Sequence, residues 1–218
     1  MGLFDKIFGK IKGAYFAFLT LISVGFGIFV ALFIYLPIDP SYSIFLNYIS
    51  DLGAGPIGSR FVFSIGMILG AIFLILLILY ISGFLKIKEE RSQRILGFQA
   101  SGTIAGLGLI LIGIFPLDST MIVAYFMHSI AAVIFFSFIA ISNFYLGYIE
   151  YKNSEFSKIL AIISIISAIL SAIFIGGFII QESGIIEPQV FVYLSEWTFL
   201  AFVTIWLIAH GIYFWKKK

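Results

Sequence analysis

Long apolar runs alternate with short polar connections along the whole chain. Each run has about 20 residues or more, which as a helix is enough to cross a hydrocarbon core of about 30 Å. The runs are apolar on every face, whereas a membrane-spanning strand alternates and needs only about 9–11 residues. We therefore predict an all-α integral membrane bundle of six transmembrane helices. The predicted spans cover residues 14–36, 61–84, 96–115, 121–147, 157–180 and 193–215.

The composition excludes a soluble globular protein. Of the 218 residues, 61% are hydrophobic and 11% are charged, whereas soluble domains have about 45–50% and about 25%. The net charge of +2 gives no reason to expect binding to nucleic acid. The sequence has no cysteine and two histidines, which excludes disulfides, thiolate metal sites and a three-histidine zinc site.

Basic residues are concentrated on alternate connections. With six spans, both termini lie on one side of the membrane, and that side receives 12 of the 13 Lys and Arg residues. Arg60 is the single basic residue on the opposite side. Cytoplasmic connections carry such an excess of positive charge. We therefore predict a multi-pass protein of the cell membrane with both termini in the cytoplasm.

Residues 1–13 are predicted to be a separate element, with the six-helix domain at 14–218. Hydrophobic residues recur at helical spacing from Leu3 to Ile11, and lysines lie between them. This pattern predicts a short basic amphipathic helix on the cytoplasmic surface of the membrane. Its simplest role is a topology anchor; the alternative is recognition of anionic lipids or of a partner.

Small residues recur at helical spacing within three of the spans. They permit close approach of helices in lipid, where the hydrophobic effect does not drive association. We predict that they form contact faces of one bundle, with a dimer interface as the alternative for any one of them. The residues are Gly66 and Gly70, Gly102 and Gly106, and Ala161, Ser164, Ala168 and Ser171.

The first outer connection, residues 37–60, contains signals for a short helix. Asp39 followed by Pro40 is typical of a helix start. An apolar stripe then predicts an interfacial helix over about 40–49. Gly53 is expected to end this segment as a left-handed cap.

Arg60 is expected to pair with an acidic side chain, since six acids and one cation lie on the predicted outer side. Asp51 and Asp118 are the two expected partners. One interpretation is a latch that holds the loop over the helix ends. The other is an acidic, partly buried pocket that binds a headgroup, a cation or a metal.

Three ionisable side chains are predicted to lie within the spans, where their insertion is costly. His128 is expected about 10 Å below the outer surface and His210 near the inner face, which is too far apart to share a metal. Glu196 is near the outer end of the sixth span. Gln99 and Asn143 are predicted near the inner face, where they could hydrogen-bond to His210.

His128 has two possible roles. It could be a neutral imidazole bonded to a serine or a backbone carbonyl, holding helices together. Alternatively, Asp51, Asp118 and His128 could form an outer site that binds a divalent ion or acts as base and acid.

Three motifs, in this order along the chain, resemble the DUF998 family of prokaryotic membrane proteins of unknown function. They are Ile49–Gly53 before the second span, Gly113–Asp118 at the end of the third, and His128 with Ala131–Ala132 in the fourth. They are more distantly similar to the eukaryotic FRAG/DRAM/SFK group. The resemblance implies six spans and no established reaction, and the link of some eukaryotic relatives to lipid organisation favours lipids. It also implies one outer constellation of Ser50, Asp51, Gly53, Pro116, Asp118 and His128.

The leading hypothesis is a non-catalytic membrane protein whose outer polar pocket binds a lipid headgroup or stabilises a membrane complex. We expect membrane lipids and other membrane subunits as partners, with no cofactor, no metal and no nucleic acid. The alternatives are a lipid-modifying enzyme, with Asp51, Asp118 and His128 as catalytic candidates, and a small transporter. The candidate binding residues are Asn47, Ser50, Asp51, Gly53, Arg60, Asp118, His128 and Glu196.

Overall fold

The computed structural model confirms an all-helical protein of the predicted class. It describes residues 8, 11–88, 93–115, 117–118, 120–185 and 190–217. Six helices are long and apolar enough to cross a membrane, and no strand occurs within these ranges. The elements are α2 (Gly13–Tyr35), the 3-10 helix η1 (Ile49–Gly53), α3 (Ile57–Lys88), α4 (Gln93–Ile114), α5 (Ile122–Lys152), α6 (Lys158–Glu182) and α7 (Val190–Lys216).

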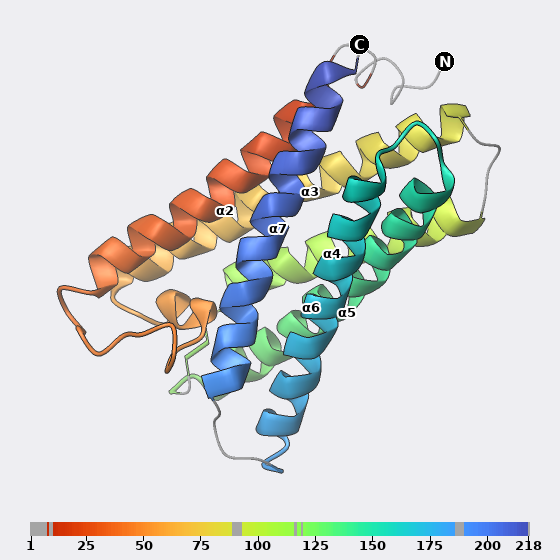
Figure 1. The fold of residues 1–218 in the computed structure, drawn as a ribbon. Helices are drawn as coiled ribbons and strands as arrows, with labels where there is room; N and C mark the ends of the chain where they lie inside the picture. The colour runs from red at the N-terminus through yellow and green to blue at the C-terminus, as the bar shows by residue number, and fades with distance from the viewer. Residues whose placement is uncertain are drawn as a thin grey trace.

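Each helix packs against its neighbour in the sequence, and α7 returns to contact α2 (Figure 1). The beginning of α2 and the end of α7 meet, since Lys12 Nζ donates a hydrogen bond to the carbonyl oxygen of Trp215 at 3.1 Å. We call this end of the bundle the terminal end. The opposite end carries the connection between α2 and α3 and is called the loop end (Figure 1).

The small residues lie where helices approach most closely within this one chain. A Cβ atom on Gly66 of α3 would come within 2.5 Å of the Gly27 Cα of α2. A Cβ on Gly102 of α4 would come within 2.8 Å of Ser142 Oγ of α5. On α6, Ser171 is buried and its hydroxyl donates to the Phe136 carbonyl at 2.8 Å. These faces therefore join helices of the same bundle.

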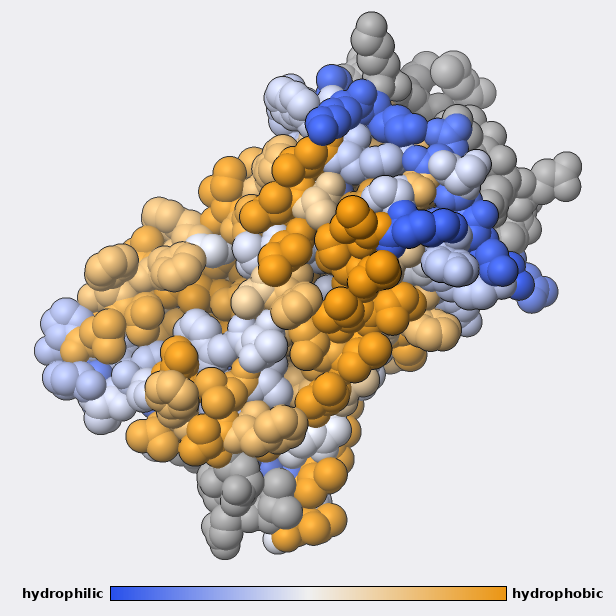
Figure 2. All heavy atoms as spheres, viewed as in Figure 1, coloured by the Kyte–Doolittle hydropathy of each residue, from blue (hydrophilic) through white to orange (hydrophobic). Residues whose placement is uncertain are grey.

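The outside of the bundle is hydrophobic between its two ends. Ile22, Phe26, Phe29 and Phe33 of α2 are 62–77% exposed. Hydrophobic residues cover much of the face drawn in Figure 2, and strongly hydrophilic ones gather at the terminal end. Such a surface fits contact with lipid, where apolar side chains lose nothing by facing outward.

Two of the helices extend several residues beyond the predicted spans. α3 begins at Ile57 rather than 61, and α5 ends at Lys152 rather than 147. Hydropathy marks the apolar part of a helix, but the backbone continues to be helical through polar residues at its ends. Most of the predicted amphipathic helix at 2–13 lies outside the described residues; Phe8 is helical and packs edge-on against Phe16 and Tyr80.

The helix predicted over about 40–49 is wrong. Residues 36–46 contain turns and irregular backbone, and the helical segment comes later, at Ile49–Gly53. Asp39 Oδ1 accepts hydrogen bonds from the backbone and hydroxyl of Ser41, so it caps a turn instead of a helix. Gly53 does not adopt the predicted left-handed conformation. A Cβ there would lie 2.8 Å from the Phe63 ring, so close packing explains the glycine.

Side chains from three helices hold the connection between α2 and α3 over the loop end. Ser59 Oγ of α3 donates to the Leu52 carbonyl at 2.7 Å. Gln181 Nε2 of α6 donates to the Tyr48 hydroxyl at 2.6 Å, and Trp197 Nε1 of α7 donates to the Asn47 carbonyl at 3.2 Å. The irregular segment is thereby fixed by tertiary contacts that no local sequence pattern encodes.

Candidate functional site

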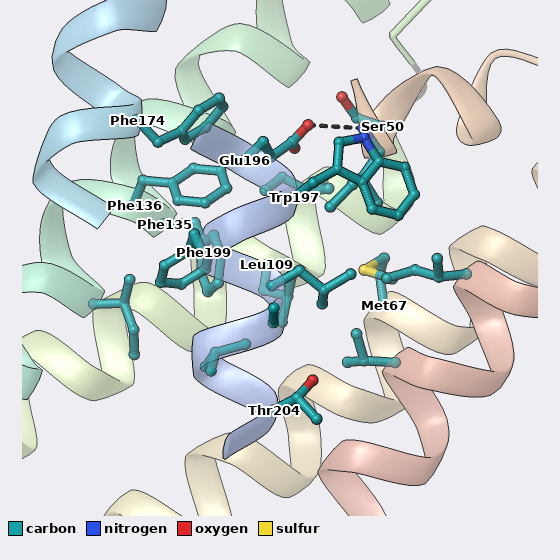
Figure 3. Close-up of a pocket in the computed structure, with 18 of the residues that line it drawn as sticks. Ser50, Met67, Leu109, Phe135, Phe136, Phe174, Glu196, Trp197, Phe199 and Thr204 are labelled. Atoms are coloured by element: carbon teal, nitrogen blue, oxygen red, sulfur yellow. Dashed lines mark hydrogen bonds between the residues drawn. The ribbon is translucent and has the colours of Figure 1, made fainter. Parts of the chain in front are cut away.

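A cavity of about 610 Å³ lies inside the bundle. It is lined by residues from all six long helices, α2 to α7, and by residues 48–50 of the loop. Its walls are mostly hydrophobic. Figure 3 shows Phe135, Phe136, Phe174 and Phe199 gathered on one side, and Met67 toward the α2–α3 side. The rings of Phe136 and Phe174 are 4.3 Å apart and edge-on, which makes this wall a packed aromatic surface.

The cavity reaches the outer surface between α2 and α7. Gly25 and Phe29 of α2 and Ala201 and Ile205 of α7 line it, and Phe29 and Ile205 are 63% and 45% exposed. The two helices are close at the terminal end and separate toward the loop end (Figure 1). We call the opening bounded by these four residues the portal. The portal lies on the apolar side surface of the bundle. It therefore opens toward the region that lipid occupies.

The polar side chains that line the cavity at the loop end include Glu196, His128 and Ser50, which we call the open cluster. Glu196 belongs to α7, and its Oε2 accepts a hydrogen bond from the Ile49 backbone nitrogen at 2.7 Å (Figure 3). Oε1 of Glu196 and the Ser50 hydroxyl have no hydrogen-bond partner among the described residues. One oxygen of Glu196 therefore holds the loop through a hydrogen bond, and the other has no hydrogen-bond partner among the described residues.

His128 of α5 is 2% exposed and holds the end of α4. Its Nδ1 lies 2.7 Å from the Phe115 carbonyl oxygen, just past the last residue of α4. A carbonyl only accepts, so Nδ1 carries the proton, and Nε2 of the neutral ring is an acceptor. Nε2 has no partner among the described residues. The predicted bond to a backbone carbonyl is confirmed.

Asn143 lines the other end of the cavity. It lies 15 residues beyond His128 on α5, which is about 22 Å along the helix. The side chain is fully buried, and neither its amide nitrogen nor its oxygen has a hydrogen-bond partner. The predicted bond between Asn143 and His210 is therefore absent. Gln99 does not bond to His210 either, since its oxygen accepts from Lys86 Nζ at 2.7 Å.

A second buried polar group, the closed cluster, consists of Glu150, His210, Ser164 and Trp206. Glu150 Oε1 is 2.7 Å from His210 Nε2, and Glu150 Oε2 accepts from Ser164 Oγ at 2.8 Å. Ser164 in turn accepts from Trp206 Nε1 at 3.0 Å, and His210 Nδ1 donates to the Trp206 carbonyl at 2.8 Å. Glu150, Ser164 and His210 are 0% exposed, so the network is dry and fully bonded.

Sequence reasoning missed Glu150 because the predicted fourth span ended at 147. The helix continues to Lys152 and turns Glu150 into the interior. A signal was present, since Asn143, Leu146 and Glu150 are spaced by three and four residues and so share a helix face. All three are buried.

The structure separates the acidic candidates. Arg60 Nη2 pairs with Asp118 Oδ2 at 2.9 Å, which is one of the two predicted partners. Asp51 instead accepts hydrogen bonds from Asn47 Nδ2 and the Tyr48 backbone nitrogen. Burial raises the pKa of Asp51, while those two hydrogen bonds act to lower it. The pKa of Asp118 is lowered, first by the hydroxyl and backbone of Thr120 and then by Arg60.

The cavity is lined by three of the eight candidate binding residues: Ser50, His128 and Glu196. Asp51 and Asp118 have different partners, and no three His, Asp or Glu side chains within the described residues are grouped to hold a metal ion. The divalent-ion interpretation of Asp51, Asp118 and His128 therefore has no geometric support. A catalytic role for the three stays a prediction, and Pro116 lies outside the described residues.

A comparison with protein-family models bears on this arrangement. The model described as "Protein of unknown function (DUF998)" matches residues 23–213. The chain belongs to the DUF998 family. The matched range includes α3 to α6, most of α2 and of α7, and every residue of both polar clusters. No curated protein and no solved structure matches the chain.

Proposed function

We propose that this DUF998 protein is a lipid-binding membrane protein whose cavity admits its ligand sideways from the bilayer. The observation that carries this proposal is an apolar cavity of about 610 Å³ with a portal on the lipid-facing surface. Ligand sites are concave and mostly apolar, with a few placed polar groups that fix orientation. The open cluster supplies those groups at one end.

The side of the membrane is part of the proposal. Described basic residues such as Lys12, Lys86, Lys158 and Lys217 belong to the terminal end, whereas Arg60 is at the start of α3 at the loop end. Positive charge favours the cytoplasmic side. The portal and the open cluster would then serve the outer half of a cell membrane. Association with other membrane subunits stays a prediction with no specific surface assigned.

A matched pair of glycine substitutions tests the proposal. Gly25 lines the portal, and a Cβ there would meet nothing within 4 Å. Gly25→Phe should therefore be tolerated at its Cβ and place its ring at the portal. Gly176 of α6 also has nothing within 4 Å and does not line the cavity, so Gly176→Phe is the control.

The measurement is native mass spectrometry of protein purified from its own membranes in mild detergent. Wild type and Gly176→Phe should retain the same bound lipid, and Gly25→Phe should lose it while keeping the helical content of wild type. Equal retention by both variants, or no retained lipid in wild type, would overturn the proposal.

A further inference from the structure

The length of the cavity limits which ligand it can hold. The lining residues extend along α5 from His128 to Asn143, and along α7 from Glu196 to Leu207. These stretches correspond to about 22 Å and about 16 Å of helix. Both lengths suit an extended hydrocarbon chain that lies along the helices.

The polar atoms without hydrogen-bond partners at the loop end determine which lipid head group can bind there. Nε2 of His128 is an acceptor because Nδ1 donates to the Phe115 carbonyl. Glu196 has no cation beside it among the described residues that line the cavity, so the neutral acid is its favoured form. Its Oε1 then carries a hydroxyl that can donate, while Oε2 accepts from Ile49. Both residues are buried, at 2% and 6% exposure. A hydroxyl head can donate to His128 Nε2 and accept from Glu196, so an alcohol satisfies both of the atoms that the protein leaves open.

The residues that line the cavity argue against a ligand with an anionic head group. No lysine or arginine is among the described residues that line the cavity. Arg60 is engaged by Asp118 and does not line it. A phosphate placed beside Glu196 would be buried with no cation, and burial of an unpaired charge is strongly unfavourable.

Resting on the proposed function, we infer that the cavity binds a lipid alcohol, with its hydroxyl donating to His128 and accepting from Glu196 and its tail extending along the cavity. A long-chain or isoprenoid alcohol has this chemistry. A phospholipid lacks the uncharged hydroxyl head that the cavity accepts.

The test uses Trp206 as the reporter, since it lines the cavity and is 1% exposed. Substituting Trp197→Phe and Trp215→Phe leaves it as the single tryptophan of the chain. The protein is placed in phosphatidylcholine vesicles and titrated with probes that share a mid-chain brominated C16 tail. The probes are the alcohol, its phosphate monoester and the hydrocarbon, and bromine quenches tryptophan fluorescence on contact.

We expect half-maximal quenching by the alcohol at a concentration lower by about tenfold or more than for the phosphate or the hydrocarbon. Combining Glu196→Ala with His128→Phe should raise the value for the alcohol to that of the hydrocarbon. Unchanged quenching by the hydrocarbon in that variant would show that the cavity is still formed.

Other outcomes separate the two proposals. Tighter binding of the phosphate, or equal binding of all three probes that Gly25→Phe abolishes, would overturn the inference and leave lipid binding in place. No quenching of Trp206 by any probe would overturn the proposed function as well.

Discussion

The open cluster and the closed cluster are both buried, but they differ in how completely their atoms are hydrogen-bonded. In the closed cluster both oxygens of Glu150 and both ring nitrogens of His210 have partners. In the open cluster Glu196 and His128 each use one polar atom and turn toward a cavity. Buried polar groups without partners are costly. A satisfied network is thus explained by stability, whereas an unsatisfied one beside a cavity supports the proposed ligand.

The hydrogen bonds of the closed cluster also determine where its protons lie. Nδ1 of His210 must donate to the Trp206 carbonyl, so one further proton is shared between His210 Nε2 and Glu150 Oε1. Whichever atom holds it, the pair has no net charge. The closed cluster can therefore stay dry without a counter-ion, and it ties α5, α6 and α7 together where they leave the cavity.

The largest expected effect comes from breaking the closed cluster. Glu150→Ala leaves His210 Nε2 unpartnered and the Ser164 O–H without an acceptor in a dry interior. We expect the free energy of unfolding to fall by about 3–5 kcal/mol. It can be measured by reversible denaturation with SDS in mixed micelles.

Glu150→Gln is the matched control. Its amide nitrogen can donate to a neutral His210, and its oxygen can still accept from Ser164, so every atom stays bonded. We expect a loss of about 1 kcal/mol or less. Equal losses for the two substitutions would show that charge, and not hydrogen bonding, stabilises the cluster.

The next effect comes from the open cluster, and it should be smaller. Glu196→Ala removes one acceptor and leaves the Ile49 backbone nitrogen unpartnered, because Oε1 contributes no bond. A loss of about 1–3 kcal/mol in the same denaturation assay is expected. Glu196→Gln keeps an acceptor for Ile49 and should lose less. A loss for Glu196→Ala as large as for Glu150→Ala would contradict the distinction between the clusters.

Asp51 gives the loop end a dependence on pH. Burial raises its folded pKa, so its contribution to stability is full below the ordinary aspartate value of about 3.9 and is lost as the pH rises through the folded value. Wild type should therefore lose thermal stability as the pH rises from about 3.9 through the folded pKa of Asp51. Asp51→Asn retains both acceptor contacts and should flatten this part of the profile. An unchanged slope in this variant would assign the effect to another group.

Asp118 should show the opposite sign and the smallest change. Its lowered pKa stabilises the protein above the ordinary aspartate value, and this contribution is lost as the pH falls through the folded value. Thr120 is the leading cause, and the Arg60 side chain is 36% exposed. We expect Arg60→Gln to shift the thermal midpoint less than Asp118→Asn. The reverse order would show that the ion pair is the stronger contact.

Much of the fold was predictable because membrane insertion imposes it on the sequence. A chain that crosses a bilayer must satisfy its backbone internally, so long apolar runs give helices and their number. The glycine faces were predictable for a related reason, since small residues are what permits close approach in lipid. The pairing of Arg60 with one of two acids followed from the scarcity of cations at that end.

The site was less predictable, since its polar residues are far apart in the chain. Ser50, His128 and Glu196 were each recognised, but they were grouped with Asp51 and Asp118, which have other partners. Glu150 was lost because a hydropathy boundary is not a helix end. The loop helix was misplaced because bonds from Ser59, Gln181 and Trp197 fix that segment.

The sequence by itself determined that this chain is a bundle of six membrane helices, because the energy of placing backbone and charge in lipid depends on local composition. Only the tertiary structure decided that α2 and α7 separate at the loop end, that a cavity remains between them, and which polar atoms face it. Those features depend on how side chains from distant segments fill or fail to fill a shared space. No local pattern of residues encodes that volume.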